Sequence, residues 1–439
     1  MLKKYIILII PIVIFAEWQI QVVDTNGGAG ASLALDSRGI PCISYGDSDN
    51  RLLKYTWWTG TDWQTRIVDS IGDWQAPISS LILDTFNVPH IAYFHQPTSD
   101  LRYAFWSDSL WFITVIDTLN NTGYIPSIDI DITGDPHISY LTIDSWDLKH
   151  ASSQNGNWSI EIVDSGNVRI LPSSLVMDGN SMIHTTYVEL LSNQQGNLKY
   201  AKKMQTGWII EIFDNSETPR PGAIALDSLS HPHIVYSVIH SLVKYAHWNG
   251  VDWIIEEVHG VPRQVNCVDI ALDKNGLPHI AYSIDEMGIW YAYKTPGGVW
   301  EREQVINGIF GQVSLALDSA DTPHIAFHDN RTFYAKRNQT GIEHKWSFPQ
   351  TNFITVYPNP VNQILGIRFC GMQDEVKTLK IFDVSGRVVR DLSALLSYSD
   401  GAVNWDLCDG RGHKVEPGVY FLLARFGSMN INKKIIVVR

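Results

Sequence analysis

One motif recurs seven times in the first three quarters of the sequence, and it constrains the fold more than any other feature. In each copy an aspartate ends a short apolar stretch, and an aromatic residue always follows nine positions later, as with Asp36 and Tyr45. The repeated aspartates are Asp36, Asp84, Asp131, Asp178, Asp227, Asp273 and Asp318. From Pro41 to Pro323 the chain advances 282 residues in six steps, a mean period of 47. Such a fixed period predicts a tandem array of one structural unit.

Each unit is predicted to form four short strands. The first ends at the repeated aspartate, the second carries the aromatic residue, and the third resembles the Leu-Lys-Tyr-Ala of residues 198–201. The fourth begins with tryptophan and ends in Val-Asp, as in residues 63–69. Apolar residues alternate with a period of two, which is typical of strands. Four strands in about 40–50 residues predict the blade of a β-propeller.

The two ends of the repeated region complement each other. Residues 18–24 have the pattern of a fourth strand, whereas the seventh copy has only three strands and stops at Tyr334-Ala335. We therefore predict an all-β chain in which residues 17–340 form a seven-bladed β-propeller closed by the N-terminal strand. Closure would remove the exposed sheet edges of an open array. An open β-solenoid is the alternative, and it would not need a displaced strand.

Residues 1–16 are predicted to be a signal peptide. Lys3 and Lys4 precede an apolar run at residues 5–15, and Ala16 provides a small residue before the expected cleavage point. The run is too short to span a bilayer, and no other stretch is long and apolar enough, so we expect no transmembrane segment after signal removal.

Charge and cysteine content narrow the class of protein. The formal net charge of −13 disfavours a nucleic-acid partner, which would require a basic face. Four cysteines in a chain of 439 residues do not make a disulfide framework. Cys42 and Cys267 lie in distant repeats and are interpreted as buried apolar residues. Cys370 and Cys408 lie close to the C-terminus and could pair.

The pattern changes after a polar linker at residues 341–353. The later motifs are Tyr-Pro-Asn-Pro at 357–360, Asp-Val-Ser-Gly at 383–386, Asn-Trp-Asp at 404–406, Pro-Gly-Val-Tyr at 417–420 and a basic pair at 433–434. In order and spacing, residues 354–439 resemble the type IX secretion C-terminal sorting domain. The residues that carry the resemblance are Pro358, Asn359, Pro360, Asp383, Gly386, Trp405, Gly418, Tyr420 and Lys434.

The resemblance implies a small immunoglobulin-like β-sandwich that sorts or anchors the protein. It also implies export across the outer membrane of a Gram-negative-type bacterium, with the secretion machinery as partner. The expected location is therefore secreted or on the outer cell surface.

No catalytic motif, cofactor site or metal site is predicted. The obvious candidates are the repeated histidines, which are His90, His137, His184, His233, His279 and His324, with Cys42 at the matching position of the first copy. Because a feature of nearly every repeat is usually structural, we interpret each histidine as the hydrogen-bonding partner of its aspartate rather than as a metal ligand. The aspartate is expected to cap the turn that follows it.

An acidic stretch and a set of tryptophans could each bind a ligand, but each also has a simpler structural interpretation. The acidic stretch at residues 47–50 could bind calcium but more simply forms a solvated turn. Several tryptophans could stack on sugar rings, although packing between sheets is the simpler reading. They are Trp57, Trp58, Trp74, Trp106, Trp146, Trp248 and Trp290.

Three functions fit these features. The favoured one is a secreted or cell-surface, non-enzymatic protein whose propeller rim binds carbohydrate or protein. The alternative is a polysaccharide hydrolase or lyase with its site at the central channel, and a structural role in a surface layer is the third. Residues that break the repeat and could serve an enzyme are Arg169, Glu189, Arg220, Arg263 and Glu286.

Overall fold

The computed structural model describes residues 18–72, 78–119, 121–165, 169–191, 195–215, 219–238, 242–338, 353–357, 361–370, 376–398, 402–426 and 429–438. The predicted signal peptide, nearly all of the linker at 341–353, and the motif residues Pro358, Asn359 and Pro360 lie outside these ranges. The chain divides into two compact units, Met1–Gly341 and Ile342–Arg439. Within the described residues, no helix has the length and apolarity needed to cross a membrane.

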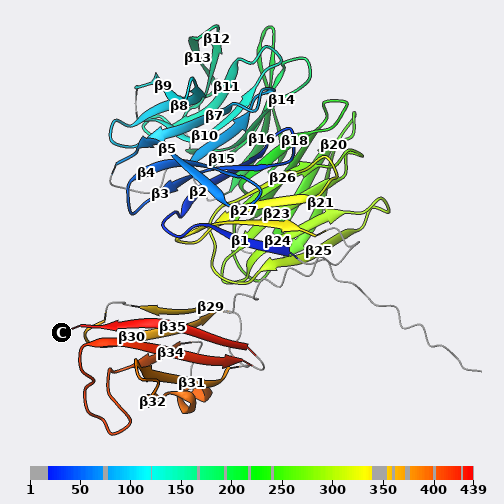
Figure 1. Cartoon of the computed structure of the whole chain (residues 1–439). Helices are drawn as coiled ribbons and strands as arrows, with labels where there is room; N and C mark the ends of the chain where they lie inside the picture. Colours follow the sequence, from blue (N-terminus) through cyan, green and yellow to red (C-terminus); the bar gives the residue numbers. More distant parts are fainter. Residues whose placement is uncertain are drawn as a thin grey trace, which may run out of the picture. The chain divides into compact units, whose positions relative to one another are not determined.

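The described part of the first unit contains seven four-stranded antiparallel sheets, here called blades 1 to 7 (Figure 1). Blade 1 contains β2 (Ala29–Leu35), β3 (Pro41–Asp47), β4 (Leu52–Trp58) and β5 (Trp63–Ser70). Blade 2 contains β6 (Ser79–Leu83), β7 (Pro89–His95), β8 (Asp100–Ser107) and β9 (Leu110–Asp117). Blade 3 contains β10 (Thr122–Ile130), β11 (Pro136–Thr142), β12 (Leu148–Gln154) and β13 (Asn157–Asp164). Blade 4 contains β14 (Arg169–Met177), β15 (Ile183–Leu190), β16 (Gly196–Met204) and β17 (Gly207–Asp214). Blade 5 contains β18 (Pro219–Leu226), β19 (Pro232–Val238), β20 (Leu242–Trp248) and β21 (Trp253–Gly260). Blade 6 contains β22 (Val265–Leu272), β23 (Pro278–Ile284), β24 (Gly288–Lys294) and β25 (Trp300–Ile306), and blade 7 contains β26 (Val313–Leu317), β27 (Pro323–His328), β28 (Thr332–Arg337) and β1 (Trp18–Asp24).

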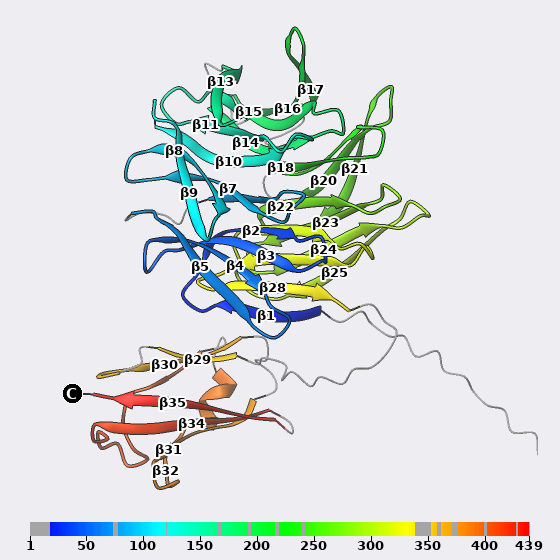
Figure 2. The same ribbon diagram turned by 45° about the horizontal axis from the view of Figure 1, so that its top comes forward.

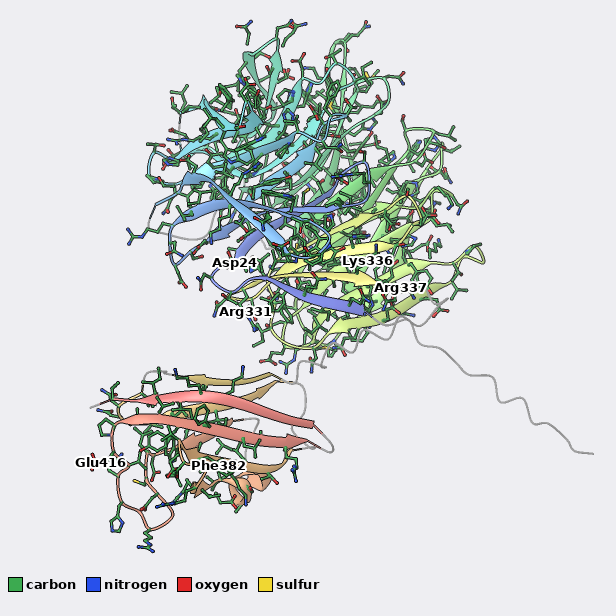
Figure 3. The ribbon with its side chains drawn as sticks, in the orientation of Figure 1. Asp24, Arg331, Lys336, Arg337, Phe382 and Glu416 are labelled. Atoms are coloured by element: carbon green, nitrogen blue, oxygen red, sulfur yellow. The ribbon has the colours of Figure 1, made fainter. Side chains whose placement is uncertain are left out.

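The N-terminal strand closes the ring. β1 pairs antiparallel with β28, and the register sets Trp18 opposite Arg337 and Asp24 opposite Thr332. Figure 3 shows Asp24 at one end of this pair and Arg337 at the other. Blades 1 and 7 also meet at the inner strands, where the Leu33 amide donates to the Ser314 hydroxyl at 3.1 Å. The predicted closed seven-bladed propeller is confirmed, and the open solenoid is excluded (Figure 2).

Small residues on the inner strands join neighbouring blades. At four of the blade interfaces, a serine hydroxyl of one inner strand accepts a hydrogen bond from a backbone amide of the next, at 3.0–3.2 Å. These pairs are Ser314 with Leu33, Ser32 with Leu81, Ser80 with Ile128 and Ser127 with Leu175. The serine explains why the inner strands alternate small and large residues, because the hydroxyl must approach the adjacent backbone.

Blade 6 has Asp269 where most blades have this serine. Its carboxylate accepts hydrogen bonds from the amides of Ile270 and Leu315, at 2.8 and 2.7 Å. Burial nevertheless raises the pKa of Asp269 to about 6. The folded protein therefore binds this proton more tightly than the unfolded chain does. Stability must then fall as the pH rises from about 4 through 6.

We expect Asp269→Asn to remove this pH dependence. Between pH 4 and pH 8 the wild type should lose about 1–3 kcal/mol of unfolding free energy relative to the variant, because only the wild type loses the proton of Asp269. Chemical denaturation at both pH values measures this difference. A wild type that loses no stability relative to the variant over this range, or that gains some, would contradict the assignment.

Each repeated aspartate lies at the end of an inner strand and organises the following turn. In all seven copies one carboxylate oxygen accepts hydrogen bonds from the backbone amides two and four residues later, at 2.7–2.9 Å. For Asp36 the donors are Arg38 and Ile40. The aspartate thus fixes the turn and, with it, the register of the first two strands.

A second contact between blades centres on the aspartate at the end of the fourth strand. In blade 2 this residue is Asp117, which accepts hydrogen bonds from Tyr140 at 2.9 Å and Lys149 at 2.9 Å in blade 3. Four other interfaces have the same tyrosine–aspartate–cation arrangement. Their members are Tyr45, Asp24 and Lys54; Tyr93, Asp69 and Arg102; Tyr187, Asp164 and Lys199; and Tyr236, Asp214 and Lys244. The remaining two interfaces carry His259 with Tyr282, and an apolar group that contains Phe327 stacked on Phe333.

The tryptophan of each fourth strand makes a third contact between blades. It packs edge to face on an aromatic ring of the preceding blade, with centroids 5.3–5.7 Å apart and planes at 64–75°. The pairs are Trp63–Tyr334, Trp111–Tyr55, Trp158–Tyr103, Trp208–His150, Trp253–Tyr200, Trp300–Tyr245 and Trp18–Tyr291. The contact recurs at all seven interfaces, so seven equivalent positions can be compared.

The second unit is a small β-sandwich. One sheet contains β29 (Phe353–Tyr357), β30 (Leu365–Cys370) and β33 (Ala402–Trp405); the other contains β32 (Val388–Asp391), β31 (Val376–Asp383), β34 (Gly418–Phe426) and β35 (Met429–Val437). A 3-10 helix, η1, spans Ser393–Tyr398. Side chains from both sheets pack around Trp405, which is fully buried.

Most of the described motif residues of this unit have structural contacts. Trp405 donates its indole N–H to the Cys408 carbonyl at 2.9 Å, and Tyr420 donates to the Glu416 carbonyl at 2.7 Å. Asp383 caps a turn that Gly386 completes with a φ of 81°, a value glycine adopts without strain. Figure 3 labels Phe382, just before this turn, and Glu416. Gly418 begins β34, and Lys434 is exposed on β35.

The possible pairing of Cys370 with Cys408, which the sequence left open, is not formed. Cys408 is a free cysteine whose Sγ lies 3.5 Å from the Asp406 carbonyl oxygen. The side chain of Cys370 lies outside the described residues.

A candidate binding pocket between blades 1 and 2

The repeated histidines hydrogen-bond tyrosines of the third strand. Nδ1 of His90, His184, His233 and His324 lies 2.5–2.6 Å from a tyrosine hydroxyl, and His279 has the same partner type. His137 differs, because its neighbour is the Nε2 of His150 at 3.1 Å. The aspartate, which was predicted as the partner, faces the other ring nitrogen at 3.3–3.8 Å in five copies. Of these five, Asp318 lies within hydrogen-bond distance, 3.3 Å from Nε2 of His324.

These histidines are neutral side chains of the core. Burial lowers the pKa of His184, His233 and His324 to about 4. Because Nε2 faces a carboxylate and carries the ring proton, Nδ1 accepts a hydrogen bond that the tyrosine hydroxyl donates. Among the described residues, no group of three or more His, Cys, Asp or Glu side chains could hold a metal ion.

The other candidates from the sequence have ordinary partners. Asp47 is fully buried and binds Lys54 at 2.6 Å and the Asn50 side chain at 2.8 Å, so its oxygens are already engaged. Arg169 stacks on Trp146 with its guanidinium carbon 4.7 Å from the ring centroid.

Of the residues proposed for the channel, Arg263 and Glu286 pair with each other, and Glu189 pairs with a lysine of its own blade. Glu189 binds Lys199 at 2.9 Å, whereas Arg263 and Glu286 pair at 2.9 Å with both side chains more than half exposed. Arg220 is half-buried, and its Nε has no hydrogen-bond partner within the described structure.

Comparison of the seven interfaces identifies one position where blade 1 differs. Three residues after the fourth-strand tryptophan, the blades carry Gln21, Arg66, Thr114, Glu161, Glu211, Glu256 and Glu303. At four interfaces the glutamine or glutamate accepts the indole N–H of the next blade, at 2.9–3.2 Å. Three of the glutamates also pair with a cation of the next blade, namely Lys203, Lys294 and Arg337.

Arg66 reverses the charge at this position. Its guanidinium carbon lies 4.6 Å from the ring centroid of Trp57 and 4.1 Å from that of Trp106, so indoles from two blades flank it. The indole N–H of Trp111, which would meet an acceptor in the common arrangement, has no hydrogen-bond partner among the described residues, as is also true of Trp208 at the interface between blades 3 and 4. The interface between blades 1 and 2 therefore lacks the usual acceptor and carries a cation.

A pocket of about 200 Å³ opens at the same interface. It lies where Cys42 replaces the histidine of the other six copies, so no imidazole fills the space beside Tyr55. Its lining residues are Asp36, Arg38, Ile40, Cys42, Tyr55, Trp57, Arg66, Asn87, Pro89 and Trp106. The pocket thus combines aromatic surface with charged and amide groups, as small-ligand sites do.

The polar groups of this pocket are held in different ways. Arg38 pairs with Asp36 through two nitrogens at 2.8 and 3.1 Å. Asn87 bridges the blades by accepting from the Ser37 amide at 2.7 Å and donating to its hydroxyl at 3.0 Å. Burial raises the pKa of Cys42 to about 11, so its thiol remains protonated and unreactive at neutral pH.

Trp57 and Trp106 were predicted as possible sugar-stacking residues, whereas Arg66 was not predicted. The signal was available, because aligning the fourth strands shows a single basic residue at a position where four copies have glutamate. Of the other tryptophans, Trp58, Trp146, Trp248 and Trp290 are half-buried, and Trp74 lies outside the described residues.

Comparison with known proteins identifies the second unit. Residues 355–438 match the family described as the secretion system C-terminal sorting domain. The C-terminal unit is a type IX secretion sorting domain. The chain is therefore a secreted or cell-surface propeller protein that is exported through its sorting domain, and the predicted resemblance is confirmed. No curated protein matches the sequence.

Solved structures share the fold at low sequence identity. A polysaccharide lyase of family PL25, an ulvan lyase, has 12% identity and a TM-score of 0.55 over 72% of this chain and 95% of its own. Virginiamycin B lyase from Staphylococcus aureus has 10% identity and a TM-score of 0.50 over 74% and 100%.

PorZ, a surface component of the type IX secretion system of Porphyromonas gingivalis, has 12% identity and a TM-score of 0.46 over 94% of this chain. The chain spans 60% of the length of PorZ. At these identities the likenesses concern the fold alone.

Proposed function

We propose that the protein is a secreted, non-catalytic glycan-binding propeller and that the pocket between blades 1 and 2 holds the sugar. The observation that carries the proposal is the coincidence of two departures from the repeat. Cys42 opens the pocket, and Arg66 changes the charge of the same interface. A structural repeat has no need of either change, whereas a binding site requires asymmetry.

The lining of the pocket suits one sugar ring. A cavity of about 150 Å³ accommodates benzene, so this pocket admits a six-membered ring with some of its substituents. Besides their contact with Arg66, the indoles of Trp57 and Trp106 line the pocket and, with Tyr55, give it apolar surface for the C–H groups of a pyranose. Asp36 and Asn87, which are already hydrogen-bonded within the protein, make the remaining wall polar.

A glycan array with the mature, full-length protein tests this proposal. Trp106→Ala removes one wall of the pocket and should weaken binding of the array hits about tenfold to a hundredfold. Trp248→Ala is the matched control, because Trp248 has the same strand position in blade 5 but packs on Trp253 away from the pocket. Silence of the wild type across all glycans, or equal losses in the two variants, would overturn the proposal.

A polysaccharide hydrolase or lyase with its site at the channel is the second candidate. The half-buried Arg220, whose Nε has no partner within the described residues, is the observation that favours it. A turnover screen on polysaccharides tests this function. Activity that disappears in Arg220→Ala and Arg263→Ala, but persists in Trp106→Ala, would replace the binding function with the enzymatic one.

A further inference from the structure

We propose that the pocket between blades 1 and 2 selects acidic sugars, with Arg66 binding the carboxylate or sulfate group of the glycan. This inference rests on the proposed glycan-binding function and specifies its substrate class. Three features of the interface support it: its charge, the position of the Arg66 guanidinium and the space beside that group.

Arg66 carries a positive charge that the protein leaves uncompensated. Among the described residues it makes no ion pair, and its guanidinium lies over the two indoles, with Tyr55 opposite it on the neighbouring strand. The neighbouring Arg38 differs, because Asp36 neutralises it within the same turn. At three other interfaces the cation meets a glutamate of the adjacent blade. An anionic group from a ligand would supply the missing partner of Arg66.

The indoles orient the guanidinium for such a ligand. The guanidinium carbon lies over both indole rings, and among the described residues its N–H groups donate no hydrogen bond, so they can receive an acidic group of a ligand. The planar fork of an arginine matches the two oxygens of a carboxylate or sulfate. Stacking also restricts the side chain before binding, which reduces the entropy lost when the ion pair forms.

The space for the sugar lies beside this charge. In blade 2 the His90 ring stacks alongside Phe105, with centroids 6.1 Å apart. Blade 1 has Cys42 opposite Trp57 in the same register, so the volume of the imidazole is empty. The ring of a bound sugar would occupy that volume while its acidic group reaches Arg66.

The net charge of the chain makes this selectivity specific to the site. At −13 the protein repels polyanions at long range. Binding of an acidic glycan therefore requires a local cation rather than a generally basic surface. A protein of this charge should show little background binding to acidic glycans once Arg66 is changed.

An array of matched glycan pairs tests the inference. Each pair differs only in the acidic group, as with oligogalacturonates and their methyl esters, or sulfated galactans and their desulfated forms. The full-length wild type should bind the acidic member at least tenfold more tightly. Arg66→Gln should abolish this preference without changing the melting temperature, and Arg66→Lys should retain part of it because the charge remains but the fork is lost.

A second variant tests the location. Cys42→His restores the imidazole of the other blades and should fill the pocket, so binding of both members should be lost while the protein stays folded.

The outcomes separate the two proposals. Equal binding of both members of every pair, or a preference for the neutral member, would overturn the acidic selectivity and leave glycan binding intact. A preference for the acidic member that survives Arg66→Gln would also overturn it. Absence of any hit would overturn both proposals.

Discussion

Asp117→Ala is expected to lower the free energy of unfolding by about 3–5 kcal/mol. Asp117 is almost fully buried, with 4% of its surface exposed, and it accepts hydrogen bonds from Tyr140 and Lys149 across the interface between blades 2 and 3. Alanine would leave the ammonium of Lys149 buried without its partner. Chemical denaturation at neutral pH, where Asp117 is ionised, measures the loss.

The apolar interface between blades 6 and 7 provides the matched control. There Ile306, Phe327 and Phe333 occupy the positions of the aspartate, tyrosine and cation. The triple variant Asp117→Ile/Tyr140→Phe/Lys149→Phe should therefore recover most of the stability that Asp117→Ala loses, because a packed apolar group can replace a buried ion pair. A loss below about 1 kcal/mol in Asp117→Ala would show that this contact does not hold the blades together.

The fold could be predicted because the repeat fixes both the strand pattern and the number of units. The nine-residue spacing from Asp36 to Tyr45 tolerates no insertion because Asp36 caps the turn and Tyr45 hydrogen-bonds to Asp24 of the preceding blade in the ring. The displaced fourth strand at residues 18–24 predicted the closure, since only a ring brings it beside β28. The sorting domain was recognised from motifs whose described residues now have turn or core positions.

The contacts between blades could not be predicted in the same way. The sequence shows that Asp117 ends a fourth strand, but not that Tyr140 and Lys149 converge on it from two strands of the next blade. These contacts between blades depend on the angle between blades, which no pattern within one repeat reports. Within a blade, each histidine was expected to bond the nearest aspartate in sequence, whereas in five copies its short hydrogen bond goes to a third-strand tyrosine and in the case of His137 to His150.

The candidate pocket was missed because it is defined by a difference between repeats. The residues that break the pattern and were expected near the channel, such as Arg263 and Glu286, form an exposed ion pair instead. Cys42 was noted as the exception to the histidine series but was interpreted only as a buried apolar residue. Its effect is to leave space, and an absent side chain becomes visible only when the neighbouring walls are in place.

A disulfide across the closing strand tests the central claim, that β1 and β28 join the two ends of the repeat into one ring. Gln19 and Lys336 lie opposite each other in this pair, and directly opposed antiparallel residues have a Cα separation compatible with a disulfide. Gln19→Cys/Lys336→Cys should therefore form an intramolecular bond under mild oxidation. The disulfide should also stabilise the fold by about 5 kcal/mol, because it closes the long loop from residue 19 to residue 336 and so lowers the entropy of the unfolded chain.

The measurement is peptide mapping of the oxidised monomer by mass spectrometry, with Gln19→Cys alone as the control for the native cysteines. The closed ring predicts that the peptides containing residues 19 and 336 are joined within one molecule, with a higher melting temperature that reduction reverses. Free thiols at both positions in the folded, oxidised protein, or bonds formed only between molecules, would contradict it.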